Sequence, residues 1–319
     1  KRSAVVVVNT IQRCIDLYKK MADKYQGLAK VFHLSTNLIP KHRKKVIQKV
    51  QKTLENNQTV ILVSTQTIEA GVDLDFEVGY RDLAPLESII QTAGRVNRHA
   101  YIKDDNNKTV SCPVYVVQIE NDHQLIYQLH HLDRTKKLLE QYNEVLEPDY
   151  LNLIDTYYQS MASHIAQESI DLWKEGIMKL NFDKISQFKL IPEDQTVVDV
   201  FVEADEEATL LADAYEMVRL KPDKLDHQLI SQVTGEIFNV DQGRSLSVYQ
   251  RKALLGLLLS RMSEYMVQIR TSRFKKAKPI AFSERGNVES TFYWVPNDQL
   301  EEFYHPEVGY AEVESARMW

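Results

Sequence analysis

Two runs of consecutive branched apolar residues constrain the fold of this 319-residue chain more than any other feature. Residues 5–8 are four valines, and residues 60–63 read Val-Ile-Leu-Val. Each run has the length of a strand and is apolar on both faces, so both faces have to be covered. Runs of this kind that alternate with segments of helical periodicity are typical of a parallel α/β sheet, with crossover helices on its two sides.

The rest of the pattern extends this prediction to three domains. We expect strands at residues 5–9, 31–34, 59–64, 78–81 and 113–119, and helices at residues 10–25, 41–54 and 86–96. Mainly helical residues follow from 122 to about 177, then a strand at 197–202, a helix at 205–217, a long apolar helix at 246–269 and a strand at 291–295. We predict an α/β domain over residues 1–122, a mainly helical linker over 123–225 and a small mixed α+β C-terminal domain over 226–319.

Other properties of the sequence favour a soluble protein of a reducing compartment. No apolar run approaches the roughly 20 residues that span a bilayer. The chain holds only Cys14 and Cys112 and therefore no disulfide framework, which favours a cytoplasmic location. A predicted strand begins almost directly after Lys1, so we expect the chain to start inside a longer protein.

The distribution of charge is compatible with a nucleic-acid ligand although the net charge is −6. Residues 1–110 contain 18 Lys and Arg against 11 Asp and Glu, a net charge of +7, and the remaining residues carry −13. Attraction to phosphate is local because salt screens charges beyond about 10 Å. A smaller basic cluster lies within the acidic part. It could contact DNA or a partner, or be solvated surface, and comprises Arg270, Arg273, Lys275, Lys276 and Lys278.

Two segments carry the residues best suited to phosphate chemistry. The first, residues 64–73, reads Ser-Thr-Gln-Thr-Ile-Glu-Ala-Gly-Val-Asp directly after a predicted buried strand. Ligands of parallel sheets bind at the carboxyl ends of the strands. There Ser64 and Thr65 can offer hydroxyl and backbone N–H groups to a phosphate. Gly71 allows close backbone approach, and Asp73 can accept hydrogen bonds from a ribose.

The second segment, residues 91–98, reads Gln-Thr-Ala-Gly-Arg-Val-Asn-Arg. On a helix Gln91, Arg95 and Arg98 would share one face, and two guanidinium groups beside an amide suit a polyphosphate held by a neighbouring domain. Taken alone, an Arg-x-x-Arg pair is usually an exposed basic helix face, and a Ser-Thr pair after a strand is usually a turn or helix cap. The two segments in this order on a parallel sheet favour a role in binding phosphates.

These two segments resemble motifs V and VI of superfamily 2 helicases. With residues 74–76 and the stretch Arg-Asp-Leu-Ala-Pro-Leu-Glu-Ser at residues 81–88, they more closely resemble the CRISPR-associated helicase–nuclease of type I systems. The stretches 33–36 and 41–43, and Asn9-Thr10, also fit that pattern. The resemblance implies a RecA-like second helicase domain, a linker and a C-terminal domain. The implied activity is ATP-dependent unwinding of invader DNA for degradation, in antiviral defence.

The resemblance also implies a role for individual residues. Arg95 and Arg98 would be arginine fingers and Gln91 a sensor of the γ-phosphate, while Gly71 and Asp73 would lie on the nucleotide side. The nucleic-acid side would comprise Asn9, Thr10, Ser35, Thr36, Ser64 and Thr65. Glu69 would repel phosphates, so we expect it to form an internal salt bridge.

Several parts of a complete motor do not occur in this sequence. It holds no Gly-x-x-x-x-Gly-Lys-Ser/Thr loop, no acidic Mg²⁺-binding motif of that type and no His-Asp pair of an HD nuclease. We therefore expect no metal site in this chain, and ATP and Mg²⁺ held mainly by a first RecA-like domain. Alone, the chain should neither hydrolyse ATP nor cleave DNA. The implied partners are single-stranded DNA, the first RecA-like and HD nuclease domains, and the CRISPR surveillance ribonucleoprotein.

Two other functions stay open on the sequence alone. The chain could belong to another superfamily 2 motor, such as an RNA helicase or a repair helicase. It could also be a non-catalytic module that binds nucleic acid or a protein, although the intact Gln91, Arg95 and Arg98 argue against that.

Overall fold

The computed structural model describes residues 3–69, 71–100, 102–103, 107–119, 127, 129–162, 170–187, 197–222, 224–235, 246–271, 278–285 and 292–310. The chain forms two compact units. The first comprises residues 1–32 and 50–194, and the second comprises residues 33–49 and 195–319. Within the described part of the chain, no helix has both the length and the apolar character needed to cross a membrane.

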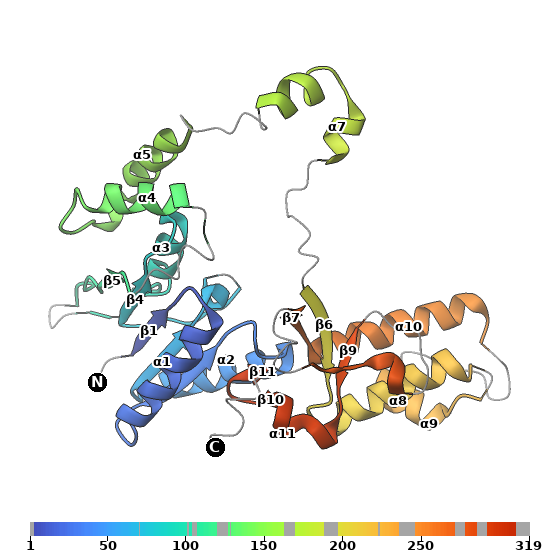
Figure 1. The fold of residues 1–319 in the computed structure, drawn as a ribbon. Helices are drawn as coiled ribbons and strands as arrows, with labels where there is room; N and C mark the ends of the chain where they lie inside the picture. The colour runs from blue at the N-terminus through green and yellow to red at the C-terminus, as the bar shows by residue number, and fades with distance from the viewer. Residues whose placement is uncertain are drawn as a thin grey trace. The chain divides into compact units, whose positions relative to one another are not determined.

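The N-terminal part of the chain forms a five-stranded sheet with strand order β2-β3-β1-β4-β5 (Figure 1). Its strands are β1 (Ala4–Val7), β2 (Lys30–Leu34), β3 (Val60–Ser64), β4 (Val78–Asp82) and β5 (Val114–Val117). The pairings of β1 with β3, β1 with β4 and β4 with β5 are parallel. Val5 and Val7 of the central strand are fully buried. The parallel α/β sheet predicted from the apolar runs is confirmed.

Three α-helices and a short 3-10 helix connect these strands: α1 (Ile11–Lys24), α2 (Pro40–Glu55), η1 (Gln66–Ile68) and α3 (Leu86–Ala93). Helix α1 begins where predicted because the Thr10 hydroxyl caps it, accepting a 3.3 Å hydrogen bond from the Arg13 amide. The helix buries Cys14 against Val6 and Val63 of the sheet. One face of the central strands is thereby covered.

The predicted helix over residues 86–96 is wrong at its C-terminal end. Helix α3 stops at Ala93, and Val96 forms a parallel β-bridge with Phe76. The Asn97 amide donates to the Phe76 carbonyl at 2.8 Å, and Asn97 takes a positive φ of 46°. Extended pairing with the segment before β4 replaces the helical bonds, so the residues after Ala93 form a turn.

The mainly helical region predicted to follow the sheet in the sequence is confirmed for its described residues. It contains α4 (Leu129–Leu139), α5 (Tyr150–Ala162), the π-helical turn η4 (Leu172–Ile177) and α7 (Phe182–Gln187). Leu138, Leu153 and Tyr157 pack with Leu86 of α3 in one apolar cluster. Helices α4 and α5 are therefore part of the first unit.

The second unit is built on a four-stranded mixed sheet with strand order β7-β6-β9-β8. The strands are β6 (Val197–Val202), β7 (Met266–Arg270), β8 (Ile280–Ala281) and β9 (Tyr293–Val295). The helices are α8 (Glu206–Leu220), α9 (His227–Thr234), α10 (Val248–Met262) and α11 (Leu300–Phe303), accompanied by the 3-10 turns η5 (Ser263–Tyr265), η7 (Phe282–Arg285) and η8 (Asn297–Gln299). A further 3-10 turn, η3 (Glu147–Asp149), precedes α5 in the first unit. Helices α8 and α10 pack together, and the small mixed α+β fold expected near the C-terminus is present.

The single long helix predicted over residues 246–269 is wrong beyond residue 262. Helix α10 ends at Met262, and Met266–Arg270 forms strand β7, antiparallel to β6. Burial alternates along β7, with Val267 and Ile269 buried and Gln268 exposed. That alternation is typical of a strand with one covered face. In the sequence it follows closely after the apolar residues of α10, which is why we predicted one continuous helix. The basic cluster continues from β7, but Arg273, Lys275 and Lys276 lie outside the described residues.

Residues 33–49 belong to the second unit through contacts with its C-terminal hairpin, β10 (Tyr304–His305) and β11 (Gly309–Tyr310). The Asn37 side-chain amide donates to the carbonyls of Val308 at 2.7 Å and Tyr310 at 2.9 Å. The Tyr304 hydroxyl accepts from the Ile39 amide at 3.1 Å.

Charged groups continue the same attachment along α2. The Lys41 ammonium lies 2.9 Å from Asp205 and 2.7 Å from Glu207 and contacts the Tyr265 hydroxyl. Lys44 pairs with Glu264 at 2.8 Å. The charges of Lys41 and Lys44 are therefore paired with acidic residues of the second unit.

Candidate functional site

The two segments with phosphate-binding character are hydrogen-bonded to each other. The Phe76 amide donates to the Arg95 carbonyl at 3.0 Å. The Asp75 carboxylate accepts from the backbone amides of Arg98 at 2.9 Å and His99 at 3.1 Å. The turn that carries both arginines is thereby fixed to the loop that follows η1, and side chains separated by about 25 residues occupy one site.

Arg95 and Arg98 lie in this turn and not on a helix, so the helical face that we inferred for them is wrong. The Arg98 guanidinium is exposed and forms a 2.8 Å ion pair with Asp73, whose side chain is 75% exposed. Arg95 is half-buried and donates through Nη2 to the backbone carbonyl of Glu69 at 2.7 Å. Burial is the largest influence on Arg95 and lowers its pKa, with the nearby Arg98 acting in the same direction.

Two other predicted site residues, Gly71 and Gln91, are exposed. Gly71 is exposed with φ of +72°, and no atom lies within 4 Å of the position a β-carbon would take. Gln91 is exposed on the last turns of α3. The structure therefore presents Gly71, Asp73 and Arg98 at the surface, and tethers Arg95 beside them.

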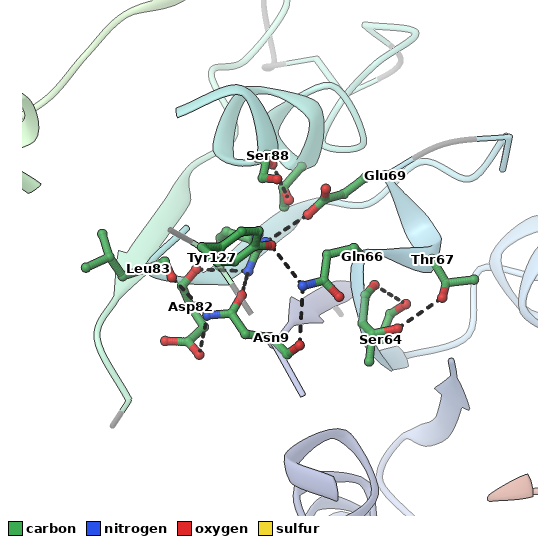
Figure 2. Close-up of polar contacts among 12 residues, drawn as sticks. Asn9, Ser64, Gln66, Thr67, Glu69, Asp82, Leu83, Ser88 and Tyr127 are labelled. Atoms are coloured by element: carbon green, nitrogen blue, oxygen red, sulfur yellow. Dashed lines mark hydrogen bonds and ion pairs between the residues drawn. The ribbon is translucent and has the colours of Figure 1, made fainter. Parts of the chain in front are cut away.

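A buried polar cluster lies inside the same end of the sheet, and its central residue was not assigned a role from the sequence (Figure 2). Its centre is Arg81 of β4, the largest side chain in the described part of the chain that is fully buried. The Arg81 guanidinium forms a 3.0 Å ion pair with Glu69. This confirms the internal salt bridge expected for Glu69. The available sequence signal was an arginine within an otherwise uncharged strand segment, Val-Gly-Tyr-Arg.

Burial acts on both carboxylates of this cluster. It is the largest cause that raises the pKa of Glu69, and the Arg81 charge opposes it. Burial likewise raises the pKa of Asp82, which accepts from the Asn9 amide at 3.0 Å and from the Ile119 backbone amide at 3.2 Å. Charged groups kept inside a protein require such partners, so the cluster is a structural base beneath the exposed residues.

The residues predicted to face nucleic acid are mostly buried. Asn9, Ser64 and Thr65 are at most 4% exposed. The Asn9 amide bonds to Asp82 and Leu83, the Ser64 hydroxyl donates to the Thr65 carbonyl at 2.8 Å, and the Thr65 hydroxyl bonds to that of Thr67 at 3.0 Å. Their side chains are buried and bonded to other groups of the protein, so a nucleic acid at these positions would have to be bound by backbone groups.

The other predicted nucleic-acid residues differ among themselves. Thr10 is half-buried as the cap of α1. Ser35 is fully buried, and its hydroxyl accepts from the Asn37 amide at 3.3 Å. Thr36 is exposed. Ser35 and Thr36 belong to the second unit, whereas the remaining predicted site residues belong to the first.

Comparison with known proteins finds similarity in the N-terminal third of the chain. Residues 1–101 match the family described as "CRISPR-associated nuclease/helicase Cas3, C-terminal". The CRISPR-associated nuclease/helicase Cas3 of Methanothermobacter thermautotrophicus is 32% identical over 174 residues, covering 54% of this chain and 19% of that protein. The Cas3 of Streptococcus thermophilus is 33% identical over 98 residues, covering 30% of this chain and 10% of that protein.

The fold extends the similarity over most of the chain. The crystal structure of T. fusca Cas3 with ATP superposes with a TM-score of 0.53 over 92% of this chain and 35% of that chain, at 16% identity. The chain thus spans only about a fifth of the length of the first of these Cas3 relatives.

Proposed function

We propose that the chain is the C-terminal part of a Cas3-type CRISPR helicase and acts as the second lobe of an ATP-driven DNA translocase in antiviral defence. In this role it supplies Arg95, Arg98 and Gln91 to a nucleotide held by another lobe. The observation that carries the proposal is the hydrogen-bonded union of residues 69–76 with residues 95–99, which presents arginine side chains beside the open Gly71.

The chemistry that this arrangement supports is stabilisation of phosphoryl transfer. When water attacks the γ-phosphate of ATP, negative charge is spread over the phosphate oxygens and the leaving oxygen. A guanidinium group placed against those oxygens opposes that charge. Arg98, whose guanidinium forms an ion pair with the exposed Asp73, would exchange this partner for phosphate oxygens. Arg95 would keep its bond to the Glu69 carbonyl, with the charges of Arg98 and Asp73 nearby.

ATP and Mg²⁺ would be held mainly by a first RecA-like lobe with a phosphate-binding loop, and the ATP complex of T. fusca Cas3 supports nucleotide binding in such proteins. This chain alone would hydrolyse no ATP, because half of the site is on that lobe. Backbone groups after β1 and β3, with the exposed Thr36, would contact single-stranded DNA. The HD nuclease and the RNA-guided surveillance complex would be its further partners, in the cytoplasm. A fold relative is titled as a CRISPR RNA-guided surveillance complex before nicking, which supports the latter.

A different superfamily 2 helicase is the alternative within the enzyme class. The matches to Cas3 over residues 1–101 favour the CRISPR motor. Stimulation of the ATPase separates the two proposals, because a DNA motor should be stimulated by single-stranded DNA and an RNA helicase by RNA. A non-catalytic binding module would show no stimulation by either.

The direct test measures DNA-stimulated ATPase with the first lobe present, in a joined or mixed two-lobe protein. Arg95→Ala and Arg98→Ala should each lower kcat by at least about 10²-fold, since an arginine finger is worth about 10³–10⁵-fold in rate. KM for ATP should change much less, because the contact forms mainly in the transition state. The matched control is Arg134→Ala on α4, away from both segments. An ATPase that tolerates both finger substitutions as well as it tolerates the control would refute the assignment.

A further inference from the structure

The guanidinium of Arg81 is a positive charge fully enclosed in the first unit. In β4 the Arg81 backbone stands opposite Val7 of β1 and Val116 of β5, so the side chain starts from the middle of the sheet. Its side chain is 0% exposed. Enclosing an unpaired charge costs several kcal/mol, so an arginine persists at such a position only where other groups compensate its charge.

Those partners come from several separate loops at the carboxyl end of the sheet (Figure 2). Nη1 donates to the Asn9 side-chain oxygen at 2.7 Å and to the Asp82 carbonyl at 2.9 Å. Nη2 donates to the Tyr127 hydroxyl at 3.0 Å and lies 3.0 Å from a Glu69 carboxylate oxygen. One planar group therefore connects the end of β4 to Asn9 after β1, to Glu69 after η1 and to Tyr127.

Glu69 is the point at which this cluster reaches the exposed site. Its carboxylate pairs with Arg81, while its backbone carbonyl accepts the 2.7 Å hydrogen bond from Arg95 Nη2. The Arg81 ion pair holds the Glu69 side chain, and the carbonyl of the same residue is the acceptor of Arg95, so the backbone position at Glu69 links the two guanidinium groups. Arg95 Nε is buried and makes no hydrogen bond in the described part of the chain. The Glu69 carbonyl is thus the main polar restraint on that guanidinium.

We propose that Arg81 is a positioning residue, which holds Glu69 and thereby fixes the guanidinium of Arg95 for the transition state of ATP hydrolysis. This inference rests on the proposed function, which makes Arg95 a finger. The same guanidinium bonds to Asn9, which follows β1. Arg81 therefore also joins a loop expected near DNA to the finger, and it gives the two loops one shared geometry.

Lysine cannot reproduce this geometry. An ammonium group keeps the positive charge but lacks the planar fork that reaches Asn9 and Glu69 at the same time. Arg81→Lys should therefore leave the fold in place while loosening Glu69 and the acceptor of Arg95. Misplacement of a catalytic group by about 1 Å costs on the order of 10²-fold in rate. We expect kcat to fall about 10- to 100-fold with KM for ATP unchanged within about twofold.

The experiment is a double-mutant cycle in the two-lobe protein with saturating single-stranded DNA. It compares kcat and KM for the unmodified protein, Arg81→Lys, Arg95→Ala and the double variant. If Arg81 acts through Arg95, adding Arg81→Lys to Arg95→Ala lowers kcat no further. Tyr157→Phe is the matched control, since it removes another buried polar contact of this unit, to His131 at 2.8 Å, far along the chain from the site.

A second variant keeps the test decisive if Arg81→Lys fails to fold. Glu69→Gln with Arg81→Met removes both members of the ion pair together, leaves neither of those two charges without its partner and should reproduce the loss of kcat. Losses from Arg81→Lys and Arg95→Ala that multiply, or an effect of Arg81→Lys no larger than that of Tyr157→Phe, overturn the positioning role alone. An ATPase unaffected by Arg95→Ala overturns the finger assignment of the proposed function and this inference with it.

Discussion

Replacement of Gly309 by alanine should separate the C-terminal hairpin from residues 33–49 and destabilise the second unit. Gly309 has φ of +88°, in the left-handed region that alanine avoids. A β-carbon there would lie 2.1 Å from the Asn37 carbonyl oxygen and 2.4 Å from the Asn37 carbonyl carbon. Both are backbone atoms that cannot rotate away, so the hairpin has to move.

The size of the effect follows from the contacts that this movement breaks. The left-handed conformation costs alanine about 1–2 kcal/mol. Separation of the hairpin from Asn37 also loses three hydrogen bonds. These are the Tyr310 amide to the Asn37 carbonyl at 3.1 Å, and the Asn37 side-chain amide to the carbonyls of Val308 and Tyr310. At about 0.5–1.5 kcal/mol for each bond, the free energy of unfolding of the second unit should fall by about 3–6 kcal/mol.

Calorimetric melting or urea unfolding of the chain measures this loss. The control is Gly235→Ala in the same unit, at the end of α9. Gly235 also has a positive φ, of +65°, but its β-carbon would meet only the end of the Arg261 side chain at 3.5 Å. That substitution should cost about 1 kcal/mol from backbone strain alone. Equal losses for Gly309→Ala and Gly235→Ala would show that the close approach to Asn37 does not exist in solution.

Two further predictions concern stability. Burial lowers the pKa of His33 to about 4, against a hydrogen bond to the Glu307 carbonyl, and burial followed by Lys45 lowers that of His42 to about 4. Between pH 6.5 and 4 the unfolded chain therefore binds protons that the folded chain does not. The free energy of unfolding thus decreases as the pH is lowered, by about 2 kcal/mol per histidine at pH 5. A urea midpoint for the second unit that is the same at pH 7.5 and pH 5 would contradict this. Asp226→Ala should cost about 1 kcal/mol because the carboxylate caps α9, accepting from the amides of Gln228 at 2.9 Å and Leu229 at 3.1 Å. Asp226→Asn, which retains an acceptor oxygen, is the comparison, and urea unfolding that fails to distinguish the two variants would exclude the cap.

The sequence alone determined the parallel sheet and the segments at its carboxyl end. Apolar runs and helical spacing are local patterns, and they report burial directly, so the strands around residues 5–8 and 60–63 were predicted correctly. The same reasoning failed after residue 262, where apolar residues occur in a strand closely after a helix. These residues form strand β7, and the sequence pattern did not show this because the partner strand β6 lies more than 60 residues away in sequence.

Only the tertiary structure decided how the candidate site is assembled. The bond between Arg95 and the Glu69 carbonyl, and the place of both arginines in a turn, follow from the bridge between Val96 and Phe76. The role of Arg81 depends on partners up to 72 residues away, so no spacing in the sequence indicates it. The partners of a buried charge are residues that the fold brings together from distant parts of the sequence, whereas hydrophobic periodicity is a property of neighbouring residues along the chain.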